Sequence, residues 1–160
     1  MRKILALLLS VLLLCAPALG MAESLTITPT FDGVDYVFGD FGFKITIPAG
    51  WIIEDEDEEY FFITYDEETG EWMEIVIAET GGASIMEIAE HLADEEGWEL
   101  ASVTINDIDF ILFEAAVEAE FGAFAYGPEE GLYTWFIFGP LGDDAFADLA
   151  LAIVGSIQNV

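Results

Sequence analysis

The sequence predicts an α+β domain in which an antiparallel β-sheet is flanked by two α-helices. Three observations point to this class. Short apolar stretches of strand length alternate with turn residues over most of the chain. Two segments carry apolar residues at helical spacing instead, one in the middle of the chain and one near its C-terminal end. No segment of roughly 20 to 50 residues repeats, which argues against a solenoid or a propeller.

The first 22 residues have the layout of a secretory signal peptide. Two cations precede an apolar run over residues 4–14, which is shorter than the roughly 20 residues that a membrane-spanning helix needs. Small residues allow cleavage after Gly20 or after Ala22. The alternative is lipidation of Cys15, but Leu14 stands where a lipoprotein signal has a small side chain. We expect a secreted or extracytoplasmic protein with no membrane span after leader cleavage.

Negative charge dominates the rest of the chain. All 32 acidic residues follow the leader and Lys44 is the only Lys or Arg beyond it, so the mature chain has a formal charge of −31. Such a surface repels phosphate backbones and anionic lipids, which argues against nucleic acid and membrane-surface binding, and it attracts cations and basic proteins. The sole cysteine, Cys15, lies in the leader, so we expect no disulfide and no thiolate metal site.

The remaining chain divides into a lead-in segment, residues 23–35, and a single α+β domain, residues 36–160. Pro29 and the turn signal Asp32-Gly33 leave room for at most one short edge strand before residue 41. Strict alternation of apolar and polar residues then predicts a strand that ends at Pro48. The apolar positions of this strand are Phe41, Phe43, Ile45 and Ile47.

Further strands are predicted in hairpins. Residues 60–65 and 72–78 are apolar runs joined through the turn residues Thr69-Gly70. Residues 100–117 predict a hairpin that turns at Asn106-Asp107, and strands over 119–126 and 132–138 follow. The last of these is apolar on both faces apart from Thr134, so we expect it to be covered on both sides.

Two helices are predicted. The first begins at a capping box formed by Ser84 and Glu87 and ends near Gly97. Its buried stripe consists of Ile85, Ile88, Ala89 and Leu92. The second begins at Asp143 or Asp144, whose carboxylates suit a first turn. Its stripe consists of Phe146, Leu149, Ala150, Ile153 and Ile157. We expect the two helices on opposite faces of the sheet.

Three phrases of the chain resemble a known family: IPAGW at residues 47–51, VTINDIDFILFE at 103–114 and FADLALAIVGSIQ at 146–158. With the order of the elements, they resemble the PsbP-like α/β/α sandwich modules of secreted bacterial proteins over residues 36–158. The resemblance implies a binding or assembly module and no enzyme, and it supplies no catalytic motif. Its relatives include extrinsic subunits of the oxygen-evolving photosystem and a nuclear-import factor that binds a small GTPase. The near-absence of cations departs from the family and leaves the partner open.

Residues 54–59 form an unbroken run of carboxylates. Within it, Asp55, Asp57 and Glu59 have the one-three-five spacing of a calcium loop, and Asp66 stands at the twelfth place. The loop is not an EF-hand, because Tyr60 replaces the glycine of the sixth place and the flanking elements are strands. Two interpretations stay open: a weak calcium site, and a solvated acidic loop at the end of a hairpin. No other cofactor is expected.

Candidates for catalysis are weak. His91, the only histidine, lies on the polar side of the first helix beside Glu87 and Asp94, so we expect a solvated side chain and no general base. No G-x-S-x-G elbow surrounds any serine. We expect a secreted non-catalytic binding module whose partner is a basic protein or an envelope component bridged by cations. The alternatives are a secreted hydrolase with paired carboxylates and a calcium-binding extracellular protein.

Overall fold

The computed structural model describes residues 23–55, 61–96, 99–114, 122–127, 131–140 and 144–160. The signal-peptide prediction and the predicted helix end at Gly97 lie outside these residues. The elements are, in chain order, β1 (Glu23–Leu25), β2 (Gly33–Phe38), the 3-10 turn η1 (Gly39–Phe41), β3 (Phe43–Pro48), β4 (Ile52–Asp55), β5 (Phe61–Tyr65), β6 (Trp72–Glu79), α2 (Ile85–Glu96), β7 (Glu99–Ile105), β8 (Ile108–Glu114), β9 (Gly122–Tyr126), β10 (Leu132–Gly139), α3 (Asp144–Val154) and β11 (Gln158–Asn159).

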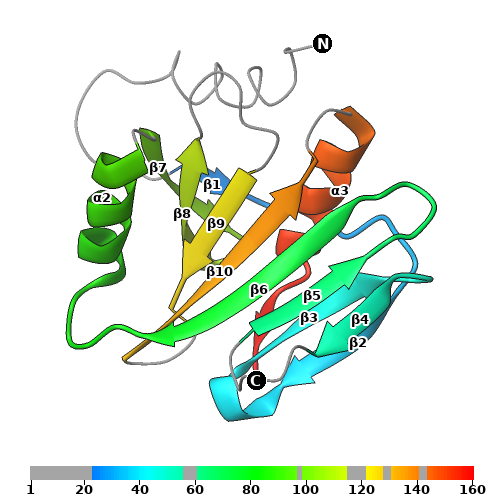
Figure 1. Cartoon of the computed structure of the whole chain (residues 1–160), viewed down its shortest axis with the longest axis horizontal. Coiled ribbons are helices and arrows are strands. Elements are labelled where there is room, and N and C mark those ends of the chain that lie inside the picture. The colour runs from blue at the N-terminus through cyan, green and yellow to red at the C-terminus, as the bar shows by residue number, and fades with distance from the viewer. Residues whose placement is uncertain (1–22, 56–60, 97–98, 115–121, 128–130, 141–143) are drawn as a thin grey trace.

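The strands form two sheets (Figure 1). The large sheet has eight strands in the order β1-β7-β8-β9-β10-β6-β5-β4, and the small sheet has three in the order β11-β3-β2. All neighbours are antiparallel except β1 and β7, which pair in parallel. The prediction of an α+β fold with two helices is confirmed. The prediction of a single antiparallel sheet flanked by helices is wrong, because β3 pairs with β2 and β11 and not with the large sheet.

The alternation in β3 explains how the two sheets meet. Phe43, Ile45 and Ile47 are at most 4% exposed, and they belong to the same core cluster as residues of the large sheet such as Phe136 and Ile75. The apolar face of β3 therefore lies against the large sheet, and its two edges pair within the small sheet. A period of two shows that a strand has one buried face, but it does not show which strands lie beside it.

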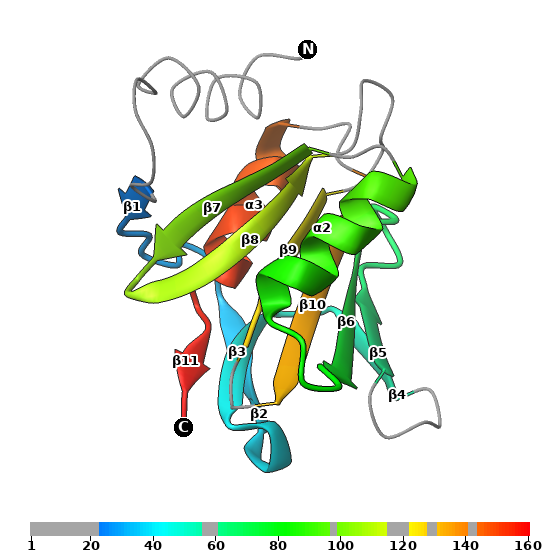
Figure 2. The same cartoon turned by 90° about the vertical axis from the view of Figure 1, so that its left-hand side faces the viewer.

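The large sheet is covered on both faces. Phe110 of β8 belongs to the core cluster shared with the small sheet and with α3, whereas its neighbour Ile111 packs in a second cluster with Ala89 of α2. Successive residues of a strand point to opposite faces, so α2 and α3 lie on opposite sides of the large sheet, as predicted (Figure 2).

Two strands near the N-terminal side differ from the sequence prediction. Residues 23–40 form both β1 and β2, where at most one edge strand was expected. Residues 52–55 form β4, although Glu54 and Asp55 have low strand propensity. Pairing along the length of β5 stabilises this short strand, with Ile52 opposite Tyr65 at one end and Asp55 opposite Phe62 at the other.

The β7–β8 turn joins three distant parts of the chain. Asn106 and Asp107 both have positive φ, 49° and 67°, as a two-residue type I′ turn requires. The Asn106 side chain accepts a hydrogen bond from Ile27 N–H (2.9 Å) and donates to the carbonyls of Ile27 and Gly155 (2.7 Å each). It therefore fastens the segment after β1 and the end of α3 to the tip of the β7–β8 hairpin.

Tyr126 places a hydroxyl in the aromatic part of the core. Its side chain is 2% exposed and packs on Phe110 and Phe43, with ring centroids 5.3 and 6.0 Å away. Burial raises the pKa of the phenol well above its ordinary value. Within the described residues the hydroxyl has no hydrogen-bond partner.

We expect Tyr126→Phe to raise the free energy of unfolding by about 1 kcal/mol, because a buried hydroxyl without a partner costs roughly that much to desolvate. Urea unfolding of the variant and the wild type measures the difference. The matched control is Tyr133→Phe, at a half-buried position of β10, with an expected change within about 0.5 kcal/mol. A loss of stability in Tyr126→Phe would show that the hydroxyl is hydrogen-bonded.

Candidate functional site

The four predicted calcium ligands do not all lie at one place. Asp55 is the last residue of β4, whereas Asp66 follows the last residue of β5. Asp55 is paired with Phe62, so Asp66 is four residues further along, about 13 Å at the rise of a strand. The structure therefore places Asp55 and Asp66 at opposite ends of the β4–β5 hairpin. Asp57 and Glu59 lie outside the described residues, and calcium binding by the acidic run stays a prediction.

Asp66 has a structural role in its own turn. Its Oδ1 accepts hydrogen bonds from the N–H groups of Glu68 (2.7 Å) and Thr69 (3.3 Å), and its carbonyl accepts one from Gly70 N–H (2.9 Å). Gly70 has a φ of 75°, which a glycine adopts without strain. The carboxylate thus closes an Asx-type turn between β5 and β6. Across the part of the chain that the structure describes, no three His, Cys, Asp or Glu side chains come together as ligands for a metal ion.

His91 lies on the solvent side of α2, as the helical spacing predicts. Its side chain is 74% exposed, and its Nε2 lies 3.8 Å from Oε1 of Glu95, one helical turn further on. Glu95, which the prediction did not name, is therefore the carboxylate within ion-pair distance of His91. An exposed imidazole with a single carboxylate at 3.8 Å has the surroundings of a surface histidine.

The capping box at the start of α2 is present as predicted. Ser84 N–H donates to Oε2 of Glu87 (2.8 Å), and Glu87 N–H donates to Oγ of Ser84 (3.2 Å). The Ser84 hydroxyl also donates to the same carboxylate oxygen (2.8 Å). Ser84 is therefore engaged as an N-cap, which is its structural role.

We expect Ser84→Ala to lower the free energy of unfolding by about 1 kcal/mol, because the first turn of α2 loses a capping acceptor. Chemical denaturation measures the change. Ser102→Ala, at an exposed position of β7, is the matched control, and we expect a change within about 0.5 kcal/mol. Equal stability of both variants and the wild type would show that the cap contributes nothing.

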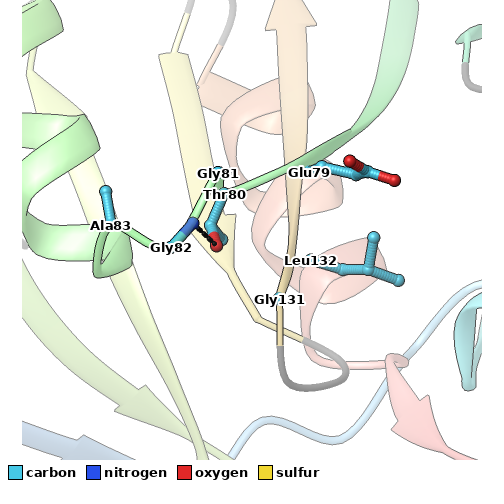
Figure 3. Close-up of a pocket in the computed structure, with 7 residues that line it drawn as sticks. All are labelled: Glu79, Thr80, Gly81, Gly82, Ala83, Gly131 and Leu132. Carbon is cyan, nitrogen blue, oxygen red and sulfur yellow. Dashed lines mark hydrogen bonds between the residues drawn. The ribbon is translucent and has the colours of Figure 1, made fainter.

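A shallow pocket opens at the loop before α2 (Figure 3). It is lined by Glu79, Thr80, Gly81, Gly82, Ala83, Gly131 and Leu132. Several of its polar groups are already used within the loop: Gly82 N–H donates to Oγ1 of Thr80 (3.2 Å), and Thr80 N–H donates to the carbonyl of Gly131 (2.8 Å). Glu79 is the only charged side chain of the lining, so the pocket supplies no pair of catalytic groups and repels anions.

The outer face of the small sheet holds the only Lys or Arg of the described residues. Nζ of Lys44 on β3 lies 3.1 Å from Oδ2 of Asp35 on β2, and the hydroxyl of Thr46 donates to the other oxygen of Asp35 (2.9 Å). The hydrogen bond from Lys44, with a second from Thr46, lowers the pKa of Asp35 below its ordinary value. Hydrogen bonds from Ser84 lower the pKa of Glu87 in the same way.

These two lowered pKa values predict a loss of stability in acid. Because folded Asp35 and Glu87 bind protons less readily than in the unfolded chain, their contribution is complete above about pH 4.5 and disappears as the pH falls through the folded pKa values. We expect the difference in urea midpoint between the wild type and Asp35→Asn/Glu87→Gln to shrink between about pH 4.5 and 2. If the urea midpoints of the wild type and the double variant differed by the same amount at every pH in this range, the lowered pKa values of Asp35 and Glu87 would be contradicted.

The two sheets and two helices define the class of the protein as an α+β domain, and the comparisons with known proteins refine it. No protein-family model and no curated protein matches the sequence. Among solved structures, cyanobacterial PsbP (CyanoP) from Synechocystis sp. PCC 6803 is similar, with a TM-score of 0.59 and 14% identity over 91% of this chain and 97% of that chain. A structure from Bacteroides thetaiotaomicron VPI-5482 has a TM-score of 0.47 and 13% identity over 80% of this chain and 48% of that chain.

The chain has a PsbP-like fold, which confirms the resemblance seen in its sequence. Neither α2 nor α3, with 12 and 11 residues, is long and apolar enough to cross a membrane, and these are the only α-helices of the described residues.

Proposed function

We propose that this protein is a secreted, non-catalytic module that binds a basic partner through its acidic surface. The observation that carries the proposal is the charge: 32 acidic residues are opposed by Lys44 alone after the leader. A surface of this charge raises the local concentration of cationic ligands and increases their association rates. The PsbP-like fold is compatible with the proposal, since the resemblance of the sequence to PsbP-like modules implies a binding or assembly role.

The contacts of Lys44 add to this support. Its ammonium group is paired with Asp35, so the single positive side chain of the described residues is largely neutralised by its neighbour. A cationic ligand therefore meets little repulsion on the surface around it, and exposed acids such as Asp32, Asp40 and Glu67 add attraction. An extracytoplasmic location follows from the apolar leader and belongs to the same proposal.

Calorimetric titration of the purified protein with two synthetic peptides tests the proposal. One peptide alternates valine with lysine, and the other alternates valine with glutamate. We expect binding of the lysine peptide and no detectable binding of the glutamate peptide, in the presence of either calcium or a chelator. Equal affinity for both peptides would overturn the proposal. Binding that requires calcium would favour a cation-bridged partner, and cleavage of a glycan or peptide substrate by the protein would favour the hydrolase alternative.

A further inference from the structure

The outer edge of β2 is an open sheet edge. β2 is the terminal strand of the small sheet, and no other strand of the described residues pairs with its far side (Figure 1). Four of its six residues are exposed: Gly33, Val34, Asp35 and Val37. Val34 and Val37 are 68% and 58% exposed, which makes them two of the most exposed large apolar residues of the described chain.

The hydrogen-bond pattern of the small sheet shows which groups point outward. Ala49 N–H donates to the carbonyl of Asp32 (2.8 Å), and Pro48, opposite Gly33, has no N–H. Residues of an antiparallel pair alternate between hydrogen-bonded and non-hydrogen-bonded positions. The alternation therefore directs the main-chain N–H and C=O groups of Gly33, Asp35 and Val37 away from β3, toward the open edge.

Natural sheets protect such edges with lysine, proline, bulges or very short strands. β2 has none of these within its six residues, GVDYVF. Its neighbourhood is acidic instead: Asp32 precedes the strand, Asp35 lies at its centre and Asp40 follows it, all exposed. An apolar strand edge with carboxylates at both ends complements an extended segment that alternates apolar and cationic side chains.

We infer that the edge of β2 is the docking strand for an extended cationic segment of a partner protein, which adds to the small sheet as a fourth strand. This inference rests on the proposed function, since it assigns the place where the basic partner binds. Apolar residues of the segment contact Val34 and Tyr36 on one face, and its cations lie beside Asp32 and Asp40 at the two ends of β2, since Asp35 is already paired with Lys44.

A second copy of this chain is a poor occupant of the same edge. Two copies bring together two chains with a formal charge of −31 each after the leader, and the repulsion between two such surfaces opposes their association. The charge therefore selects a basic partner against self-association.

The test compares the lysine–valine peptide with the same peptide N-methylated at every backbone amide, which keeps the charge and side chains but cannot donate to a strand. We expect the unmodified peptide to bind at least about tenfold tighter, a difference of about 1.4 kcal/mol. Amide exchange measured by NMR is expected to slow at Gly33, Asp35 and Val37 when the peptide binds. We expect smaller changes at Val34 and Tyr36, because their main-chain N–H groups already point toward β3.

Variants of the protein give a matched control. Val34→Lys places a cation on the edge and is expected to weaken binding at least about fivefold. Val160→Lys adds the same charge at a residue that is 63% exposed and outside β2, and we expect a change below about twofold.

Equal affinity for the unmodified and the N-methylated lysine–valine peptides would overturn the docking strand while leaving the proposed function intact. Exchange protection at residues outside β2 would do the same. If neither of these two peptides bound, both the docking strand and the proposed function would be overturned. If sedimentation showed that the wild type is a dimer and that Val34→Lys is a monomer, the edge would belong to a second copy of the chain, and the inference would also be overturned.

Discussion

Replacing Phe43 by alanine is expected to lower the free energy of unfolding by about 3 to 5 kcal/mol. Phe43 is fully buried, stacks on Phe38 at 4.7 Å between ring centroids, and meets the edges of Tyr126 and Phe136 at 6.0 Å. Phe38 belongs to the small sheet, and Tyr126 and Phe136 belong to the large sheet. The ring therefore joins the two sheets, and its removal leaves a cavity at their interface and removes the aromatic contacts that add to simple burial.

Equilibrium unfolding in urea measures this effect, and two variants define its cause. Phe43→Leu keeps most of the apolar volume and is expected to cost about 1 to 2 kcal/mol. Val37→Ala shortens an exposed residue of the adjacent strand and is expected to change stability by less than about 0.5 kcal/mol. If Phe43→Ala cost no more than Val37→Ala, the small sheet would not be packed on the large one as described.

The second large effect is expected at Asn106. We expect Asn106→Gly to lower the free energy of unfolding by about 3 kcal/mol, because three hydrogen bonds are lost and the partly buried groups of Ile27 and Gly155 are left without their partner. Glycine adopts the φ of 49° freely, so the change tests the side chain and not the turn.

Asp107→Gly is the matched control for Asn106→Gly. Asp107 is exposed, has a φ of 67° in the same turn, and occupies the position where glycine is favoured in a type I′ hairpin. Its replacement is expected to change the free energy of unfolding by less than about 0.5 kcal/mol, measured by the same urea titration. Similar losses in both variants would mean that the turn itself, and not the Asn106 side chain, is the sensitive feature.

Local patterns in the sequence predict the features that depend on nearby residues. The Ser84 and Glu87 box and the turn at Asn106-Asp107 depend on neighbours within a few positions, and both are present. The predicted stripe of α3 is buried at Phe146, Ala150 and Ile153, whereas Leu149 is half-buried and Ile157 lies beyond the end of the helix. The solvent position of His91 follows from helical spacing in the same way.

Features that depend on distant residues were not predicted. The bonds of Asn106 join positions 79 and 49 residues apart, and the hydroxyl of Ser156 accepts a hydrogen bond from Thr46 N–H across 110 residues. Nothing in the local pattern indicates these partners. The division into two sheets has the same origin, since the alternation of β3 fixes its buried face but not its neighbours.

The properties of the candidate site also separate into those that the sequence predicts and those that depend on distant residues. Charge composition predicts an attraction for basic ligands without any knowledge of the fold. The separation of Asp55 and Asp66 follows from the antiparallel pairing of β4 with β5, and β4 was not predicted, because its acidic residues resemble a loop. The open edge of β2 depends on the order of the strands, which single-strand patterns do not contain.

The salt dependence of binding is the most direct test of the central claim that the anionic surface acts by charge attraction. The affinity of the lysine–valine peptide would be measured by calorimetry between 50 mM and 500 mM sodium chloride, with a chelator present. We predict that binding weakens steadily, by about tenfold or more over this range, because salt screens the attraction between the peptide and the carboxylates. An affinity that does not change with salt concentration would contradict the account.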